Sequence, residues 1–113
     1  GAAGLGDIGE LFPDTDAKFK DISSIYLLQE AYKRVQSVGF VLTNADITIM
    51  AQKPKLSKLK SKMEANIAQA LNLSQSRINV KATTTEGLGF VGRCEGIAVM
   101  ASASLKFYNW TQI

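Results

Sequence analysis

The sequence has no histidine and a single cysteine among its 113 residues. Without histidine, the chain has no imidazole with which to bind a metal ion. The lone cysteine, Cys94, cannot form an internal disulfide, which fits a reducing compartment without requiring one. No apolar run approaches the roughly 20 residues that a membrane-spanning helix needs, so we expect no membrane partner.

The composition that is present is ordinary for a soluble globular chain, with 46% hydrophobic and 20% charged residues. This length suits one domain, so we predict a single domain over residues 1–113. A net charge of +3 suggests a polyanion partner. However, Lys58, Lys60 and Lys62 lack the interleaved aromatic residues of a nucleic-acid-binding surface. We therefore interpret them as a solvated helix face and expect no nucleic acid partner.

Hydrophobic periodicity predicts an α+β fold. Residues 1–21 are rich in glycine and aspartate and are predicted to be a loop. Ser23 or Ser24 can cap a helix that runs to about residue 38 and ends at Gly39. The later elements are predicted to be strands over residues 40–52, 78–84 and 96–107, with a second helix over residues 56–71. The apolar residues of the last strand are small, which suggests close packing against a helix or another subunit.

Between the last two strands, residues 83–96 (TTTEGLGFVGRCEG) combine hydroxyls, carboxylates, one arginine and several glycines. Hydroxyl and exposed N–H groups can donate to phosphate oxygens, and a carboxylate can bind a hard divalent cation. Arginine matches an oxyanion with two parallel hydrogen bonds. Taken alone, the stretch is equally well interpreted as an ordinary glycine-rich hairpin loop.

Two more polar stretches lie elsewhere in the chain. Residues 6–16 (GDIGELFPDTD) place acids, glycines and a proline around Phe12, which we expect to be exposed. Residues 51–56 (AQKPKL) end a strand with a basic turn. Either stretch on its own is typical of a solvated turn.

Together with residues 81–86 and 89–93, these motifs resemble 2-C-methyl-D-erythritol 2,4-cyclodiphosphate synthase, a zinc enzyme of the non-mevalonate isoprenoid pathway. The resemblance runs from about Gly4 to about Leu105, and the motifs follow one another at the expected intervals. It implies a mixed β-sheet with helices packed on one face, in a homotrimer with active sites at subunit interfaces. It also implies a location in the bacterial cytoplasm or in a plastid-type organelle.

The resemblance implies a lyase that converts 4-diphosphocytidyl-2-C-methyl-D-erythritol 2-phosphate to the 2,4-cyclodiphosphate and releases CMP. The 2-phosphate attacks the β-phosphate, so no protein nucleophile is needed. Zinc and a second divalent ion, Mg or Mn, are the implied cofactors. By motif position, Thr84 is the catalytic hydroxyl and Glu86 binds the second ion. The implied substrate-binding residues are Asp7, Gly9, Phe12, Asp14, Asp16, Ala51, Pro54, Lys55, Leu56, Thr83, Thr84, Thr85, Phe90 and Arg93.

In the resembled family the zinc ligands, one aspartate and two histidines, lie in an N-terminal segment that has no counterpart here. We therefore expect an N-terminally truncated chain, the C-terminal part of the synthase domain. Two hypotheses stay open. The chain is part of a working cyclodiphosphate synthase, or it is a catalytically incomplete cytidine-nucleotide-binding module that trimerises. A weaker third is an unrelated α+β domain with a coincidental loop.

Overall fold

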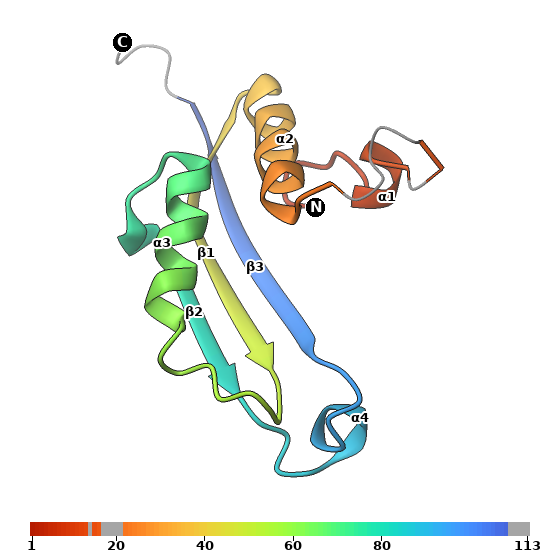
Figure 1. Cartoon of the computed structure of the whole chain (residues 1–113). Helices are drawn as coiled ribbons and strands as arrows, with labels where there is room; N and C mark the ends of the chain where they lie inside the picture. Colours follow the sequence, from red (N-terminus) through yellow and green to blue (C-terminus); the bar gives the residue numbers. More distant parts are fainter. Residues whose placement is uncertain (14, 17–21, 109–113) are drawn as a thin grey trace. The chain divides into compact units, whose positions relative to one another are not determined.

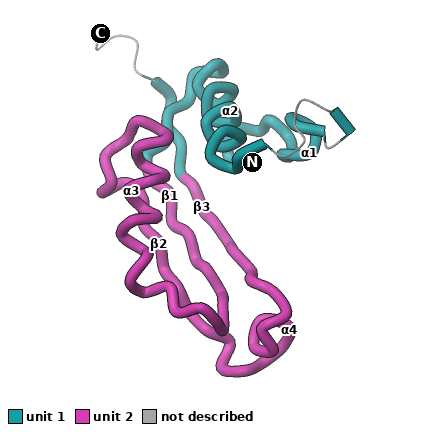
Figure 2. Tube along the Cα trace, in the orientation of Figure 1, with its two compact units in different colours: residues 1–43, 104–113 teal, residues 44–103 magenta. Residues whose placement is uncertain are grey.

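The computed structural model describes residues 1–13, 15–16 and 22–108. The helices are α1 (Ile8–Leu11), α2 (Ser24–Ser37), α3 (Lys60–Leu71), the short 3-10 helix η2 (Gln75–Arg77) and α4 (Gly89–Gly92), and the strands are β1 (Phe40–Met50), β2 (Ile78–Thr83) and β3 (Ala98–Phe107) (Figure 1). Figure 2 shows two compact units: residues 1–43 with 104–113 form unit 1, and residues 44–103 form unit 2. None of the described helices is long and apolar enough to cross a membrane.

Unit 1 contains a short helix, α1, where a loop was predicted. Asp7 is its N-cap, and the Oδ1 atom of Asp7 accepts a hydrogen bond of 2.9 Å from the Glu10 N–H. An aspartate cap with another acid in the first turn favours a helical turn. At four residues the helix is too short to leave the periodic signal on which the prediction depended.

The first long helix, α2, confirms the prediction made for residues 24–38. The Oγ atom of Ser23 accepts a hydrogen bond from the Ile25 N–H at 3.2 Å, which caps the start. Gly39 follows the end with a φ of 92°, a conformation that glycine adopts without strain. The Tyr32 hydroxyl accepts a hydrogen bond of 2.9 Å from the Leu42 N–H and so ties the helix to the start of β1.

Phe12 is buried, with 8% of its surface exposed, so the expectation of an exposed aromatic is wrong. The Arg34 guanidinium carbon lies 5.6 Å from the centroid of the Phe12 ring and covers one face of it. A phenylalanine has a large apolar area to remove from water. The residue that covers the Phe12 ring belongs to α2, more than 20 positions further along the chain. The polar residues next to Phe12 in the sequence therefore do not predict its burial.

Also in unit 1, the start of β1 lies beside the end of β3. The rings of Phe40 and Phe107 stack with their centroids 4.6 Å apart. Nearby, the Tyr108 N–H donates to the Gly39 carbonyl over 2.8 Å. Because the first residue of one strand meets the last residue of the other, β1 and β3 run in opposite directions.

The sheet has the strand order β2-β1-β3. β1 and β2 are parallel, and their pairing runs from Ala45 opposite Ile78 to Met50 opposite Thr83. A parallel pair needs a crossover connection, and α3 provides it and packs on β2. With β3 antiparallel the sheet is mixed, so the predicted α+β fold with a mixed sheet is confirmed. The packing of all helices on one face stays a prediction.

The core of unit 2 lies between α3 and the sheet. Ile78 and Val80 of β2 are 3% and 5% exposed, and Ala68 and Leu71 of α3 are buried as well. Alternate residues of a strand point to the same face, so these two strand residues both face the helix. The pairing register places alternate residues of β1 on that face too.

α3 begins at Lys60, whereas the sequence predicted a helix from residue 56. The Leu59 N–H donates to the Leu56 carbonyl at 2.9 Å, which closes a separate turn before the helical ladder begins. The chain between β1 and α3 is therefore a loop.

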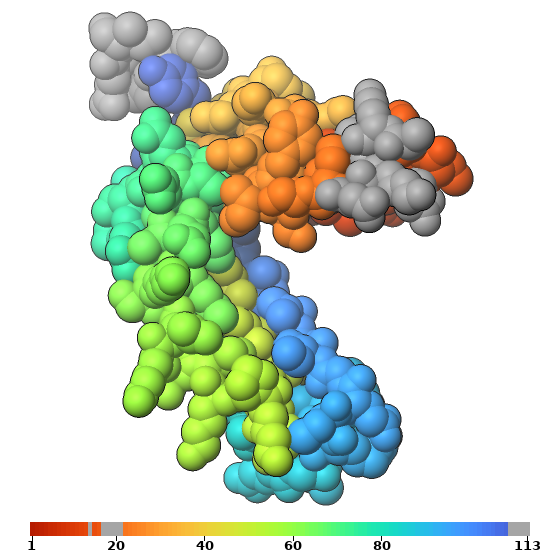
Figure 3. Space-filling view, in the orientation of Figure 1, coloured from red at the N-terminus to blue at the C-terminus, as the bar shows by residue number. Residues whose placement is uncertain are grey.

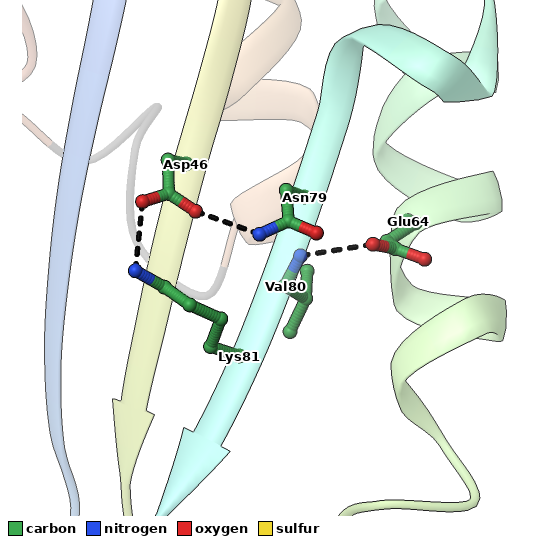
Figure 4. Close-up of polar contacts among 5 residues, drawn as sticks. All are labelled: Asp46, Glu64, Asn79, Val80 and Lys81. Carbon is green, nitrogen blue, oxygen red and sulfur yellow. Dashed lines mark hydrogen bonds and ion pairs between the residues drawn. The ribbon is translucent and has the colours of Figure 1, made fainter.

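The two edges of the sheet differ. On β2, the Val80 N–H donates to Glu64 Oε2 of α3 over 2.9 Å, so this edge group has a partner (Figure 4). On β3, Val99 is 58% and Met100 is 69% exposed. Residues 99–104 of β3 are all exposed, so the small apolar residues predicted to pack there have no cover among the described residues.

Candidate functional site

Unit 2 has a pocket of about 320 Å³ at the carboxyl ends of its two parallel strands. Parallel strands end at the same edge of a sheet, and the loops that follow them meet there. The Ala51 N–H extends the pairing by donating to the Thr83 carbonyl at 3.0 Å. The pocket is lined by Ala51, Gln52, Pro54, Lys55, Leu56, Ser57, Ala82, Thr83 and Thr84. In Figure 3 the yellow-green side chains after β1 project beside the cyan residues that follow β2.

The lining of this pocket suits an anionic ligand with an apolar part. Lys55 is its one charged residue, and no carboxylate is among the lining residues. Ser57, Thr83 and Thr84 contribute hydroxyls, which can donate to or accept from a ligand. The remaining lining residues are mostly small and apolar, so a flat ring can lie against them.

Hydrogen bonds within the turn after β2 fix its backbone. The Thr84 Oγ1 atom accepts from the Glu86 N–H at 3.2 Å, and the Thr85 hydroxyl donates to the Leu88 carbonyl at 2.6 Å. The Thr84 oxygen is therefore an acceptor within the turn, and its hydroxyl hydrogen stays free to donate to a ligand. Glu86 has a φ of 54°, a left-handed conformation that an ordinary side chain rarely adopts.

One hydrogen bond joins the two loops that form the pocket. The Gly87 N–H donates to Gln52 Oε1 at 3.2 Å, so the turn after β2 is tied to the residue that follows Ala51. Close packing fixes the same turn from the other side, because a Cβ atom at Gly92 would collide with the backbone of Gly87. Position 92 therefore requires glycine.

Of the predicted site residues, the structure brings two groups that are separated in the sequence together. Ala51, Pro54, Lys55 and Leu56 from the basic turn share the pocket with Thr83 and Thr84. Thr85 and Glu86 follow directly but do not line it. Gln52 and Ser57 lie within the segment from Ala51 to Ser57 that the resemblance assigns to the cytosine and the phosphates, although neither was named individually, and sequence reasoning missed Ala82.

Phe90 and Arg93 lie on and after α4, outside the pocket lining. Phe90 is 51% exposed, and its ring lies against Gly96. The Arg93 guanidinium is paired with Glu95 through contacts of 2.8 and 3.2 Å. That pair has two exposed partners, so it is a weak restraint that a ligand or another subunit can replace.

The acidic stretch lies in unit 1. Asp7 caps α1, Gly9 is within that helix, and Phe12 is buried under Arg34. Asp16 follows, with its N–H donating to the Pro13 carbonyl at 3.1 Å. Asp14 lies outside the described residues. The assignment of these positions to the substrate stays a prediction.

A zinc site does not fit the residues that the structure describes. The sequence has no histidine, and no group of three cysteine, aspartate or glutamate side chains comes together within residues 1–13, 15–16 and 22–108. A magnesium or manganese ion needs fewer protein ligands than zinc, because it can be held by one or two carboxylates plus ligand phosphates and water. Glu86, which has no ion-pair partner among the described residues, fits that role.

A polar cluster lies on the face of the sheet opposite α3 (Figure 4). Asp46 of β1 accepts from Lys81 Nζ at 2.8 Å and from Asn79 Nδ2 at 2.9 Å, both on β2. The hydrogen bond from Lys81, together with the one from Asn79, lowers the pKa of the Asp46 carboxyl below its ordinary value. These groups bond to each other and belong to the sheet, away from the pocket lining.

The fold and pocket together describe a class: an α+β protein with a small mixed sheet and an anion-suited pocket at its parallel strand ends. The chain belongs to the YgbB family, whose model matches residues 1–106. The family resemblance found in the sequence is thereby confirmed.

Similar proteins give the family its context. The chain is 99% identical over 113 residues to the bifunctional enzyme IspD/IspF of Campylobacter concisus strain 13826, and spans 30% of that protein's length. The structure of the bifunctional IspDF from Campylobacter jejuni matches 98% of this chain and 30% of its own, with 60% identity and a TM-score of 0.94. A 2C-methyl-D-erythritol 2,4-cyclodiphosphate synthase solved in a CDP-bound form matches 93% of this chain and 67% of its own, with 32% identity and a TM-score of 0.83.

Proposed function

We propose that this chain forms the nucleotide-binding part of a cyclodiphosphate synthase. The reaction converts 4-diphosphocytidyl-2-C-methyl-D-erythritol 2-phosphate to 2-C-methyl-D-erythritol 2,4-cyclodiphosphate and releases CMP. The observation that carries the proposal is the pocket in which Lys55 of one loop meets Thr83 and Thr84 of another. Family membership and the CDP-bound relative support it.

In this proposal the protein contributes position and charge. The phosphate oxygen of the substrate is the nucleophile, so no side chain has to form a covalent intermediate. Lys55 neutralises the diphosphate, and the free Thr84 hydroxyl hydrogen donates to an oxygen on which negative charge develops. The apolar lining from Ala51, Pro54 and Leu56 receives the cytosine ring.

Two metal ions are part of the proposal. Glu86 is the ligand that this chain offers to a magnesium or manganese ion. When bound, that ion neutralises charge on the diphosphate. Zinc would take its ligands from outside this sequence, because the described residues offer no site for it.

We also propose that the protein is a homotrimer in the cytoplasm, with Phe90, Arg93 and the acidic residues near Asp7 contributing to sites between subunits. The exposed apolar surface of β3 supports an assembly with further copies.

The alternative function is a cytidine-nucleotide-binding module that trimerises without catalysis. The two functions differ in their zinc site, which this sequence alone, having no histidine, cannot build as the resembled family does. Both functions predict CDP binding, whereas an unrelated domain with a coincidental loop predicts none.

The experiment that separates these functions uses the full-length protein that the gene encodes. CMP release from the proposed substrate is measured with and without Mg²⁺ or Mn²⁺, next to the zinc content per subunit and CDP affinity by calorimetry. Turnover with about one zinc per subunit supports the synthase. CDP binding without turnover supports the module, and the absence of CDP binding rejects both.

A further inference from the structure

We propose that three lysines at the start of α3 form a positive rim that draws anionic ligands towards the pocket without contacting them. The positive rim consists of Lys58, Lys60 and Lys62. These residues are absent from the pocket lining, but Ser57, directly before them in the sequence, belongs to it. The inference deepens the proposed function and rests on it, because the ligand expected in the pocket is a nucleoside diphosphate.

The distribution of charge along the sequence is one-sided in this region. Residues 47–85 contain a single acid, Glu64, whereas residues 53–62 contain five lysines. The Glu64 carboxylate is engaged on β2, where it accepts from the Val80 N–H at 2.9 Å. None of the three rim lysines has an ion-pair partner among the residues that the structure describes. Their positive charge is therefore not neutralised locally.

The fold places these charges towards the pocket end of unit 2. Because α3 is the crossover between two parallel strands, its N-terminus points towards the edge at which both strands end (Figure 1). The Leu59 N–H donates to the carbonyl of Leu56, a lining residue, and this turn holds Lys58 close to the pocket. Lys58 and Lys62 are exposed, whereas Lys60 is half-buried.

The same lysines are unfavourable for the helix itself. The N-terminus of a helix carries a partial positive charge, which favours acids in the first turn and disfavours lysines. The first turn of α3 contains Lys60 and Lys62 and no acid, and the N-cap residue, Leu59, makes no side-chain hydrogen bond. The helix dipole and the lysines therefore add to one positive field. A local arrangement that opposes stability is expected where the sequence serves function.

The positive rim complements the pocket electrostatically. Lys55 is the sole charged residue of the described lining, so the pocket itself holds little charge. Exposed lysines outside it stay hydrated, so they attract an anion without the cost of burying an ammonium group. A positive field at the mouth of a concave site raises the local concentration and the association rate of an anionic ligand. The gain grows with ligand charge, so it is largest for CDP, smaller for CMP and absent for neutral cytidine.

The test variant is Lys58→Gln/Lys62→Gln, which lowers the net charge by two. Lys60 is left in place because it is half-buried. The control is Gln69→Glu/Arg77→Gln, which makes the same change of charge at exposed positions of unit 2 outside the pocket lining. Position 69 lies about 10 Å beyond Lys62 along α3, and position 77 lies about 20 Å before the pocket end of β2.

The experiment measures Kd on the full-length protein at 0.02 M and 0.5 M NaCl, for CDP and CMP by calorimetry and for cytidine by NMR titration. Two charges about 12 Å from the ligand predict that at about 0.02 M the test variant binds CDP about fivefold and CMP about threefold more weakly, with cytidine unchanged. At about 0.5 M all three should lie within about twofold of the wild type, because salt screens the field. The control should stay within about twofold throughout. One lysine alone should change Kd by less than about twofold at about 0.15 M salt.

Each outcome supports or overturns the inference. If the test variant binds CDP as the wild type does at low salt, or if the control loses as much affinity, the inference is wrong while the proposed function stands. A loss that persists at high salt, or that extends equally to cytidine, would show that the lysines act by contact or through the fold, which also overturns it. If the wild type binds neither CDP nor CMP, the proposed function fails and the inference fails with it. Should the double variant not fold, Lys58→Gln, which lies before the helix, should show about half of the change in log Kd.

Discussion

Lys55 is the charged residue of the pocket, and its contribution can be measured against a neighbour. We predict that Lys55→Ala raises the KM for the cytidine diphosphate substrate about tenfold, because a hydrogen bond to a charged group typically contributes about 1.5–3 kcal/mol. Lys58→Ala is the control, since Lys58 is exposed and absent from the pocket lining. Equal KM values for both variants would remove Lys55 from the site.

Glu86 is predicted to act through a divalent ion. In Glu86→Gln the side chain keeps its shape but loses the charge that a hard cation prefers. We expect the Mn²⁺ concentration for half-maximal activity to rise about tenfold or more, with an unchanged melting temperature. Glu30→Gln, which removes a carboxylate paired with Lys33 on α2, is the control. An unaltered Mn²⁺ dependence would contradict the role.

The ionisation of the Asp46 carboxyl affects the stability of the fold. Its pKa is lowered in the folded state by the Lys81 hydrogen bond, and next by Asn79. A lowered pKa stabilises the fold above the unfolded pKa of about 3.9, and this stabilisation is lost as the pH falls through the folded pKa.

We therefore predict that Lys81→Met lowers the melting temperature at pH 6 and that the difference from the wild type disappears toward pH 2–3. Lys62→Met is the control, because Lys62 has no ion-pair partner among the described residues. Melting is followed by calorimetry across this pH range. A difference that stays constant with pH would show that Lys81 contributes packing and not charge.

At the scale of elements, Glu64 of α3 closes part of the β2 edge through the Val80 N–H. Glu64→Ala leaves that partly buried donor without its partner, so we predict a loss of about 1–3 kcal/mol in the free energy of unfolding. Glu64→Gln keeps an acceptor oxygen of the same reach and should lose less than half as much. Urea unfolding measures both variants. Equal losses would mean that the hydrogen bond is not what stabilises the edge.

Elements with a cap and a long apolar period were predictable from the sequence. Ser23, Gly39 and the periodicity between them define α2, and the alternation in β1 and β2 gives both strands to within two residues. The one-turn helices α1 and α4 were missed, because four residues cannot show a period. The start of α3 was misplaced because periodicity ignores the separate turn at Leu56.

The candidate site was predictable in part for a topological reason. Lys55 and Thr84 are distant in sequence, yet the loops after two parallel strands have to meet at one edge of the sheet. The sequence motifs identify the loops but not the contacts between them. The bond from Gly87 to Gln52 and the pairing of Arg93 with Glu95 depend on side-chain placement in three dimensions, and no local pattern encodes either.

At the scale of the molecule, several large apolar residues of β3 and of the loop before it are exposed. Leu88 is 74%, Met100 is 69% and Val99 is 58% exposed. An edge strand with exposed apolar residues is a site for association, and proteins usually protect such edges. A homotrimer that buries β3 would remove this surface from water.

The proposed trimer can be tested by placing a charge on that strand. We predict that Val99→Lys converts the assembled protein to smaller species, because a buried unpaired ammonium costs far more than a lost apolar contact. Gln69→Lys on the exposed side of α3 makes a similar change of charge away from β3 and should leave the assembly intact. Sedimentation velocity at several protein concentrations measures both variants. If Val99→Lys sediments as the wild type does, β3 is not the interface, and sites shared between subunits would then have to be formed by another surface.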